Sequence, residues 1–385
     1  MTAALEGTRV IEIANYVGGP YAGALLADLG AEVIKIEPPP HGDPYRGWIS
    51  GGYSSTFCQL NRGKKSMLLD LQSEDGKRAA IALAKTADVL IQNSRPGVMD
   101  RLGLGYEALH ELNPRLVYCS VTGFGPSGPY VKRPGYDTIG QAMSGLLSLV
   151  TDLDAPKPMG ISLSDHIAGL YACYACLAGL AARERTGQGQ HVRTSLLESS
   201  MAFIAENMAR FLEDGGRSPD RSTRVRTAQV YAFLDSQGKP FVLHLSTPDK
   251  FWHGVARAID RPDLIDDPRF KTRKDRIDHR EDIEAILTPV FAGNTREHWL
   301  ARLQANDVPS TAANTFEDVV EDPQVQHLGI IQEVTHPTMG SLRLIGPGIT
   351  MDSTPTTIGP APTLGEHTDA ILAELGLSTS PAAGG

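Results

Sequence analysis

The chain has 385 residues, with 36 Lys or Arg against 45 Asp or Glu, so its formal net charge at pH 7 is −9. Its 41% apolar and 21% charged residues suffice for a large core and about two or three domains, which excludes wholesale disorder. Because the basic residues are scattered along an acidic chain, we expect neither nucleic acid nor a membrane as partner, but a small molecule held by a local basic patch.

Strand and helix patterns alternate from the N-terminus to about residue 120. Strands are predicted at 8–14, 32–36, 65–71, 88–92 and 116–121, and helices at 20–29, at 73–84 and before 113–114. Such alternation is typical of a parallel sheet whose helical crossovers cover both faces. The sequence therefore predicts an α/β fold with a doubly wound sheet.

The remaining elements indicate a second, smaller domain. An apolar run at 167–182 predicts a buried helix, because it is shorter than the roughly 20 residues that a membrane span needs. Further along, the sequence predicts a hairpin at 229–234 and 241–245, charged amphipathic helices at 248–305, a strand at 341–345 and a closing helix at 366–375. The hairpin and the charged helices indicate a small α+β domain at 226–312.

The cysteines and histidines point away from metal or disulfide chemistry. Four cysteines and the absence of a basic, then apolar leader in the first ten residues predict a reduced, cytoplasmic protein. Cys173 and Cys176 lie inside the apolar helix without a second Cys/His pair, which favours core thiols over a metal site. His166, His191 and His244 are isolated, so no metal site is expected.

Two segments at predicted strand ends are candidate anion sites. Residues 17–23 form a glycine-rich turn before a helix, where free N–H groups and the helix dipole favour an anion. A dinucleotide fingerprint would need glycine in place of Pro20, although Glu37 stands near the position of a ribose-binding acid. An NAD-dependent oxidoreductase site and a simple packing turn are the alternatives. Residues 95–101 can present two guanidinium groups to phosphates, or form a solvated loop.

Asp165 stands at the start of the apolar helix. An acid at this position is commonly an N-terminal cap, so Ser164 or Asp165 would satisfy the free N–H groups. The functional alternative is a carboxylate kept ionised by backbone donors and the dipole in a partly apolar cleft, as a nucleophile requires. The residues alone leave both interpretations open.

Eleven short motifs, in order along nearly the whole chain, carry a family resemblance. They are LEGTRVIE at 5–12, LGAEVIKIE at 29–37, LNRGKKS at 60–66, NSRPG at 93–97, RLG at 101–103, GFG at 123–125, GYD at 135–137, DHIAG at 165–169, RTGQGQ at 185–190, DPRF at 267–270 and LGEHT at 364–368. This pattern resembles CoA-transferase family III, which includes formyl-CoA transferase and, as a relative of the same fold, alpha-methylacyl-CoA racemase.

The resemblance implies a CoA-transferase with Asp165 as its nucleophile. Its carboxylate would attack an acyl-CoA thioester to give a mixed anhydride, and the released thiolate would convert this into an aspartyl-CoA thioester. A small carboxylic acid, such as a dicarboxylate, would then take the CoA. Backbone groups of Val17, Gly18 and Gly19 would hold the oxyanions, and Asp137 would orient or polarise the site. No permanently bound cofactor is implied, since acyl-CoA is the substrate.

The resemblance also implies contacts with CoA. Lys64, Arg95 and Arg101 would face its phosphates, Asn93 and Ser94 would line the cleft at the strand end, and Tyr136 would contact the pantetheine or acyl end. Pro38 replaces an arginine that contacts adenosine in formyl-CoA transferase. As a hypothesis from its place in a loop, Arg46 is a candidate counter-charge for the acceptor acid.

Three alternatives remain beside the transferase. A racemase of this family would have histidine at the place of Tyr136, and a tyrosine with a pKa near about 10 is a poor base. The others are an NAD-dependent oxidoreductase and a non-catalytic CoA-binding subunit. The family architecture implies a large Rossmann-like domain from 1–205 and 330–385, linkers at 206–225 and 313–329, the small domain at 226–312, and an interlocked homodimer.

Overall fold

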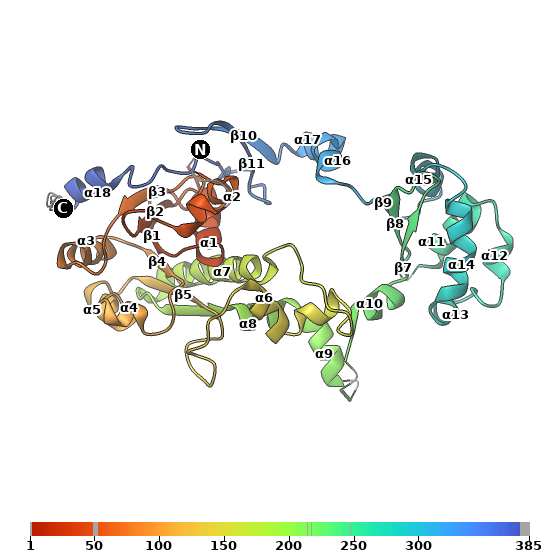
Figure 1. Cartoon of the computed structure of the whole chain (residues 1–385), viewed down its shortest axis with the longest axis horizontal. Coiled ribbons are helices and arrows are strands. Elements are labelled where there is room, and N and C mark those ends of the chain that lie inside the picture. Colours follow the sequence, from red (N-terminus) through yellow and green to blue (C-terminus); the bar gives the residue numbers. More distant parts are fainter. Residues whose placement is uncertain (1, 49–52, 214, 217, 247, 378–385) are drawn as a thin grey trace. The chain divides into compact units, whose positions relative to one another are not determined.

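The computed structural model describes residues 2–48, 53–213, 215–216, 218–246 and 248–377. The chain forms two compact units (Figure 1). Unit 1 comprises Met1–Leu147, Pro158–Ala209 and Gln324–Gly385, and unit 2 comprises Ser148–Lys157 and Arg210–Pro323. Both ends of the chain thus belong to unit 1. The predicted domain limits stay a prediction, and the end of the predicted large domain, 378–385, lies outside the described residues.

Unit 1 is built on a parallel sheet of six strands. In sequence order these are β1 (Arg9–Ile13), β2 (Glu32–Glu37), β3 (Lys65–Leu68), β4 (Val89–Gln92), β5 (Val117–Thr122) and β6 (His191–Ser195). Their spatial order is β3-β2-β1-β4-β5-β6, and every neighbouring pair is parallel. This confirms the predicted α/β class. Strand β6, which the sequence patterns did not predict, completes the sheet.

Helices and a hairpin complete unit 1. The helices are α1 (Gly18–Asp28), α2 (Ser55–Leu60), α3 (Glu74–Ala84), α4 (Val98–Arg101), α5 (Tyr106–Leu112), α6 (Asp137–Met143), α7 (Leu163–Thr186), α8 (Leu196–Phe203) and α18 (Thr368–Glu374), with the 3-10 turn η1 (Pro44–Gly47). The hairpin pairs β10 (Ile331–His336) with β11 (Gly340–Ile345). Three elements cross the limits of the units, η2 (Leu146–Leu149), α9 (Ala205–Glu213) and α17 (Pro323–Leu328).

Alternating side chains of the strands belong to two hydrophobic cores, one on each face of the sheet. Val10, Val33 and Val89 pack with α1 and α7 on one face. Ile11 and Ile34 pack with α3, α5 and α18 on the other. Because successive side chains of a strand point to opposite faces, each strand is buried on both sides, as a parallel sheet requires.

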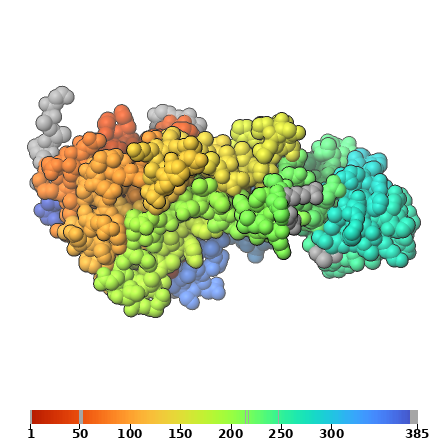
Figure 2. Space-filling view, turned by 90° about the horizontal axis from the view of Figure 1, so that it is seen from below, coloured from red at the N-terminus to blue at the C-terminus, as the bar shows by residue number. Residues whose placement is uncertain are grey.

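The closing helix α18 joins the two ends of the chain in unit 1. The backbone N–H of Leu68 in β3 donates to Thr368 Oγ1 at 2.9 Å, and that of His367 donates to the carbonyl of Ser66 at 2.9 Å. In the space-filling view, the C-terminal segment (blue) accordingly lies against the N-terminal part of this unit (Figure 2). The edge strand β3 is therefore covered by sequence that lies about 300 residues away.

Helix α7 is longer than predicted, with 24 residues. By length and composition it is long and apolar enough to cross a membrane, and 44% of its most apolar 18-residue window is buried. Core helices of globular proteins meet the same criteria. Here α7 packs against α1, α8 and strands β5 and β6.

Unit 2 is a small α+β unit around an aromatic core. Its antiparallel strands are β7 (Val230–Leu234), β8 (Pro240–His244) and β9 (Ser310–Ala312). Its helices are α10 (Arg221–Thr227), α11 (Asp249–Ala258), α12 (Asp263–Asp266), α13 (Arg273–Asp278), α14 (Arg280–Phe291), α15 (Arg296–Ala305) and α16 (Phe316–Glu321). Phe291 of α14 lies at the centre, with ring centroids 4.8 Å from Phe233, 5.1 Å from Phe241 and 5.3 Å from Trp299.

We predict that Phe291→Ala lowers the free energy of unfolding of unit 2 by about 3–5 kcal/mol, because it leaves a cavity among these rings. Urea titration followed by tryptophan fluorescence measures this, since Trp252 and Trp299 are buried in unit 2 while Trp48 is 61% exposed. The control is Phe316→Ala, at a side chain that is 89% exposed. Equal effects of the two substitutions would contradict the placement of the core.

Candidate active site

A cavity of about 240 Å³ lies at the carboxyl ends of β1, β4 and β5 in unit 1. The winding of the sheet reverses between β1 and β4, and ligands of open α/β sheets bind at such a point. Residues lining the cavity include Asn15, Tyr16, Val17, Gly18, Asn93, Ser94, Arg95, Arg133, Gly135, Tyr136, Asp165 and Leu196. The structure therefore brings together seven of the predicted site residues: Val17, Gly18, Asn93, Ser94, Arg95, Tyr136 and Asp165.

Two helices begin beside this cavity because their backbones pack closely. A Cβ added at Gly169 of α7 would lie 2.7 Å from the carbonyl oxygen of Gly18 in α1. A Cβ at Gly18 would lie 3.4 Å from the carbonyl oxygen of Asp165. Glycine at position 169 thus permits a contact that a larger residue would prevent, and it places the N-terminal turns of α1 and α7 together.

The first turn of α1 offers unused hydrogen-bond donors. The N–H groups of Val17, Gly18 and Gly19 make no hydrogen bond with the described part of the chain, and no side chain caps the helix. Val17 and Gly18 line the cavity. Gly19 does not line the cavity. A Cβ at this position would lie 2.4 Å from the Cβ of Ala14, so Gly19 serves close packing of the backbone. Two donors at a helix N-terminus make this wall of the cavity favourable for an anion.

Asp165 is the third residue of α7 and does not cap it. Ser162 precedes the helix without a side-chain hydrogen bond, and the carboxylate of Asp165 bonds no described residue. Instead, the N–H of Asp165 donates to Oδ1 of Asp137 at 3.2 Å. The capping interpretation of Ser164 or Asp165 is therefore wrong. Asp137 supplies the acceptor at this helix end and leaves the Asp165 carboxylate free at the cavity.

Burial, and secondly the charge of Asp137, raises the pKa of Asp165 to about 7. Desolvation disfavours the ionised form, and a neighbouring negative charge acts in the same direction. Near neutral pH the carboxyl group is therefore poised between its two protonation states. Such a perturbed acid in a cavity is typical of a functional site.

The loop between β1 and α1 is held in a strained conformation. Tyr16 has φ +67°, a left-handed value that costs about 1–3 kcal/mol for a non-glycine residue. Asn93 fixes the preceding residue twice, because its Oδ1 accepts from the N–H of Asn15 at 3.1 Å and its Nδ2 donates to the Asn15 carbonyl at 2.7 Å. The rings of Tyr16 and Tyr136 then meet edge to face at 6.4 Å. Asn93, which was predicted to line the cleft, thus fixes the conformation of this loop through its side chain.

Two arginines of the cavity wall have guanidinium groups without a protein carboxylate among the described residues. Arg95 follows β4 and is exposed. Arg133 stacks on Tyr130 at 3.9 Å from the ring centroid. Arg133 was not among the predicted site residues, although its position two residues before the Gly-Tyr-Asp motif at 135–137 was an available signal. Together these groups give one small cavity two positive charges.

A second cavity, of about 780 Å³, adjoins the first. Asn15 and Ser94 line both. The walls of the second cavity are largely apolar, with Pro38 and Pro39 among them. Arg101 and Lys77 supply positive charge, and Asp70 supplies one negative charge. The predicted phosphate contact Arg101 therefore lies in a different cavity from Asp165, but the two cavities share a wall.

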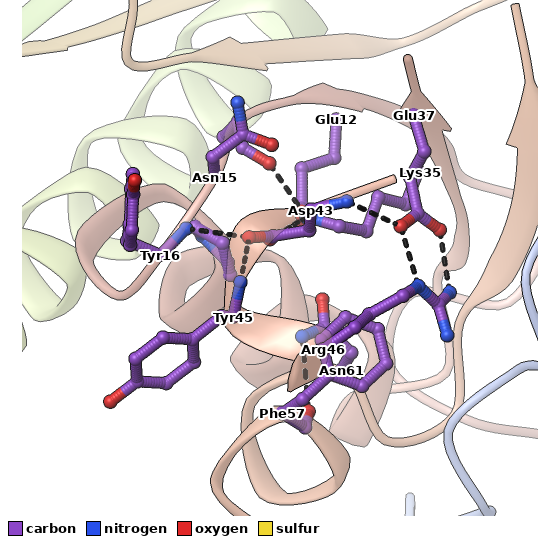
Figure 3. Close-up of polar contacts among 12 residues, drawn as sticks. Glu12, Asn15, Tyr16, Lys35, Glu37, Asp43, Tyr45, Arg46, Phe57 and Asn61 are labelled. Carbon is purple, nitrogen blue, oxygen red and sulfur yellow. Dashed lines mark hydrogen bonds and ion pairs between the residues drawn. The ribbon is translucent and has the colours of Figure 1, made fainter. Parts of the chain in front are cut away.

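Lys64, Arg46 and Glu37, which were candidates for ligand contacts, are buried and paired with other protein groups. Lys64 is fully buried, and its Nζ donates to Glu12 Oε2 at 2.7 Å, to the Pro20 carbonyl at 2.7 Å and to Asn61 Oδ1 at 2.9 Å. Arg46 is 6% exposed and forms a bidentate pair with Glu37, at 2.7 and 2.6 Å (Figure 3). The expected contact of Lys64 with phosphate therefore does not fit the structure, and neither does the expected contact of Arg46 with the acceptor acid. Glu37 is bound by Arg46 and is not available to a ribose.

The described residues contain no group of three or more His, Cys, Asp or Glu side chains that could hold a metal ion. Cys58, Cys119, Cys173 and Cys176 are all free and buried. Cys173 and Cys176 belong to the core between α7 and the sheet, as predicted.

The fold and the site define an open α/β sheet with a cavity at its carboxyl edge, where ligands of such sheets bind, and with an aspartate at that cavity. Comparison with known proteins identifies the family, because the sequence pattern of CoA-transferase family III matches residues 5–368. The chain belongs to this family, and it is an enzyme of the CoA-transferase class.

Curated relatives carry related names. Succinyl-CoA:glutarate CoA-transferase of Mus musculus is 34% identical over 96% of this chain and 86% of its own length. Succinate–glutarate CoA-transferase of Agrobacterium fabrum is 34% identical over 96% of this chain and 95% of its own length. Acetyl-CoA:oxalate CoA-transferase of Acetobacter aceti is 37% identical over 79% of each chain.

Solved structures share the whole fold. A CAIB/BAIF family protein from Brucella suis superimposes with a TM-score of 0.86 at 33% identity, over 97% of this chain and 100% of that one. Rv3272 from Mycobacterium tuberculosis gives a TM-score of 0.85 at 31% identity, over 96% and 99%. The architecture is therefore that of the CAIB/BAIF proteins.

We predict that Asp165→Asn raises the melting temperature, and by more at pH 8 than at pH 5. The pKa of Asp165 is about 7 in the folded chain and about 4 in an unfolded one. Ionisation therefore costs stability that grows between these values and is constant above pH 7, whereas the amide does not ionise. Thermal denaturation at both pH values measures the difference. The control is Asp154→Asn, at an exposed position, and an equal gain at both pH values would show that Asp165 is not desolvated.

Proposed function

We propose that this enzyme moves CoA from an acyl-CoA donor to a small dicarboxylic acid through an aspartyl-CoA thioester on Asp165. One observation carries the proposal: the Asp165 carboxylate bonds no described residue and faces a cavity between two helix N-termini. Unpaired N–H groups of Val17 and Gly18 line the same cavity. A nucleophile and oxyanion donors are thus available to one reacting carbonyl group.

The proposed chemistry alternates between anhydride and thioester. The Asp165 carboxylate attacks the donor carbonyl and releases CoA thiolate, leaving an aspartyl–acyl anhydride. The thiolate attacks the aspartyl carbonyl and releases the donor acid, leaving aspartyl-CoA. The acceptor carboxylate then attacks this thioester and releases the thiolate again. Finally the thiolate attacks the acceptor carbonyl, which gives the new acyl-CoA and returns Asp165 as a carboxylate.

The two adjoining cavities suit the two ends of an acyl-CoA. We place the nucleotide in the larger one, where Pro38 and Pro39 contribute apolar walls and Arg101 contributes charge for phosphate. The pantetheine arm would pass Asn15 and Ser94, which line both cavities. Its thioester would then reach Asp165, with Tyr136 beside the acyl end and Arg95 near the shared wall.

The charge of the smaller cavity supports a dicarboxylate as acceptor. One carboxylate of the acid must face Asp165 to react, and Arg133 or Arg95 can pair with the other. The names of three relatives, which specify glutarate or oxalate, support the same class. Succinyl-CoA and glutarate are therefore the first donor and acceptor to test.

The assembly and the location of the enzyme are also proposals. We infer an interlocked homodimer and the predicted domain limits from the family resemblance stated above. The four free, buried cysteines fit a reducing compartment such as the cytoplasm.

The covalent intermediate is testable by mass spectrometry. The protein is incubated with succinyl-CoA in the presence of hydroxylamine, which converts an activated carboxyl group to a hydroxamate. We expect a hydroxamate on the peptide that contains Asp165, and none in Asp165→Asn, because an amide cannot attack the thioester. Modification of another residue, or none with any acyl-CoA, would contradict the proposed mechanism.

A parallel incubation with a 2-methylacyl-CoA and hydroxylamine in heavy water tests the racemase alternative. Deuterium entering the α-carbon of a 2-methylacyl-CoA without any hydroxamate would indicate proton transfer in place of CoA transfer. Tyr136 stands at the place of the histidine that a racemase of this family would have, and its side chain is 63% exposed. We therefore expect no exchange.

The acceptor is testable at Arg133. We predict that Arg133→Gln lowers kcat/KM for glutarate about 10- to 100-fold, because it removes a charged partner of the second carboxylate. The value for butyrate, which lacks that group, should change little. Lys132→Gln is the matched control, since Lys132 is adjacent and exposed but does not line the cavity. Equal losses for both acids would exclude the role of Arg133.

A further inference from the structure

Four charged side chains form a chain of ion pairs beneath the β1–α1 loop. Asp43 Oδ2 lies 2.9 Å from Lys35 Nζ, which lies 2.8 Å from Glu12 Oε1, and Glu12 Oε2 lies 2.7 Å from Lys64 Nζ. All four side chains are 0% exposed. We name this set the buried ion cluster. Its two positive and two negative charges cancel.

Stability alone does not account for the buried ion cluster. Removing charges from water is expensive, and well-packed apolar side chains are often as stabilising as a buried ion pair. Burial itself opposes the charged form of Lys35, yet Asp43 and Glu12 raise its pKa above the ordinary value. The ionised form of Lys35 is therefore stabilised by its charged partners. The hydrogen bonds between the cluster and the backbone indicate its structural role.

Three members of the buried ion cluster bond the backbone of the β1–α1 loop or of the first turn of α1. Lys35 Nζ donates to the Ala14 carbonyl at 2.6 Å, before the strained residue. Asp43 Oδ1 accepts from the N–H of Tyr16 at 3.2 Å, and Lys64 Nζ donates to the Pro20 carbonyl at 2.7 Å. Figure 3 shows Asp43 between Lys35 and the backbone of Tyr16. The loop is thus fixed before, within and after the turn that begins α1.

Asp43 also connects the loop to the neighbouring turn η1. The same Oδ1 accepts from the N–H of Tyr45 at 2.9 Å. The rings of Tyr45 and Trp48 then meet the ring of Tyr16 edge to face, at 6.3 and 6.1 Å. One carboxylate therefore sets the position of Tyr16 through both its backbone and its ring.

We propose that Asp43 and Lys35 are positioning residues for catalysis, which hold the strained loop so that the N–H groups of Val17 and Gly18 meet the oxyanion formed at Asp165. This inference rests on the proposed function. A left-handed tyrosine persists only where its surroundings determine it, and Asp43 is the group that bonds its N–H. Oxyanion donors act because they are already in place when charge develops, so a small displacement reduces kcat without preventing binding.

The test replaces the charges together so that none is left unpaired. Lys35→Met/Asp43→Leu keeps the approximate size of both side chains and leaves the Lys64–Glu12 pair intact. We expect a folded protein whose Kd for CoA changes by less than about threefold, while the rate of hydroxamate formation at Asp165 falls about 100-fold. A structural role alone would leave that rate unchanged in a folded protein, and this result would overturn the proposal.

A rescue variant isolates the contact with Tyr16. In Lys35→Met/Asp43→Asn the amide oxygen can again accept from the N–H of Tyr16 without any charge. We expect it to recover at least about tenfold of the lost rate relative to the Leu variant. No recovery would show that the hydrogen bond is not the element that positions the loop. If the Leu variant does not fold, Lys35→Met/Asp43→Ala replaces it, because a smaller side chain introduces no clash.

A second buried ion pair in the same unit provides the matched control. Arg62 and Asp28 have side chains that are 3% and 2% exposed and pair with each other. Among the described residues, their side-chain hydrogen bonds run to each other and to the Gln59 carbonyl, not to residues 14–17. We expect Arg62→Met/Asp28→Leu to leave hydroxamate formation within about twofold. The native protein is measured first, so absence of any hydroxamate there would refute the proposed function, whereas a normal native rate with unaffected variants would refute only the positioning role.

Discussion

The close packing of α1 on α7 is the contact on which the site depends. With Gly169 placed so that a Cβ would lie 2.7 Å from the Gly18 carbonyl, no larger residue fits without moving the helices apart. The contact brings the first turns of both helices to the carboxyl edge of the sheet. Asp165 thereby loses water while two free N–H groups come to line the same cavity. One steric constraint thus produces both the perturbed acid and the N–H donors that line its cavity, and such donors at a helix N-terminus favour anions.

The environment of Asp165 balances two demands of the proposed reaction. Burial and the charge of Asp137 favour the protonated form of Asp165, whereas its position in the first turn of α7 favours the ionised form through the helix dipole. A carboxylate that is weakly solvated attacks readily, yet it must also leave from an anhydride in the last step. A pKa of about 7 places the group where neither form dominates strongly near neutral pH. A fully solvated or fully ion-paired aspartate would meet only one of the two demands.

Local patterns predicted the elements, and tertiary contacts decided the roles of the charged residues. Alternating strand and helix patterns identified β1 to β5 because both faces of a parallel sheet are apolar. The same patterns missed β6, because the residues of His191–Ser195 are polar apart from Val192. The nucleophile candidate Asp165 and the loop at Gly18 do meet at one cavity. Lys64 and Arg46 were assigned to ligands because a sequence does not show that their partners, Glu12 and Glu37, come from other strands and bury them.

Three of the motifs that carry the family resemblance are therefore linked physically, by charge. Glu12 lies in the motif at 5–12, Lys35 in that at 29–37 and Lys64 in that at 60–66, and they pair with one another beneath the loop. Removing one member would leave an uncompensated buried charge, which costs about 3–5 kcal/mol. The motifs consequently act as a unit, and all three side chains are fully buried against protein partners. Their effect on chemistry passes through the backbone of the β1–α1 loop, so motif membership by itself does not make a charged residue a binding residue.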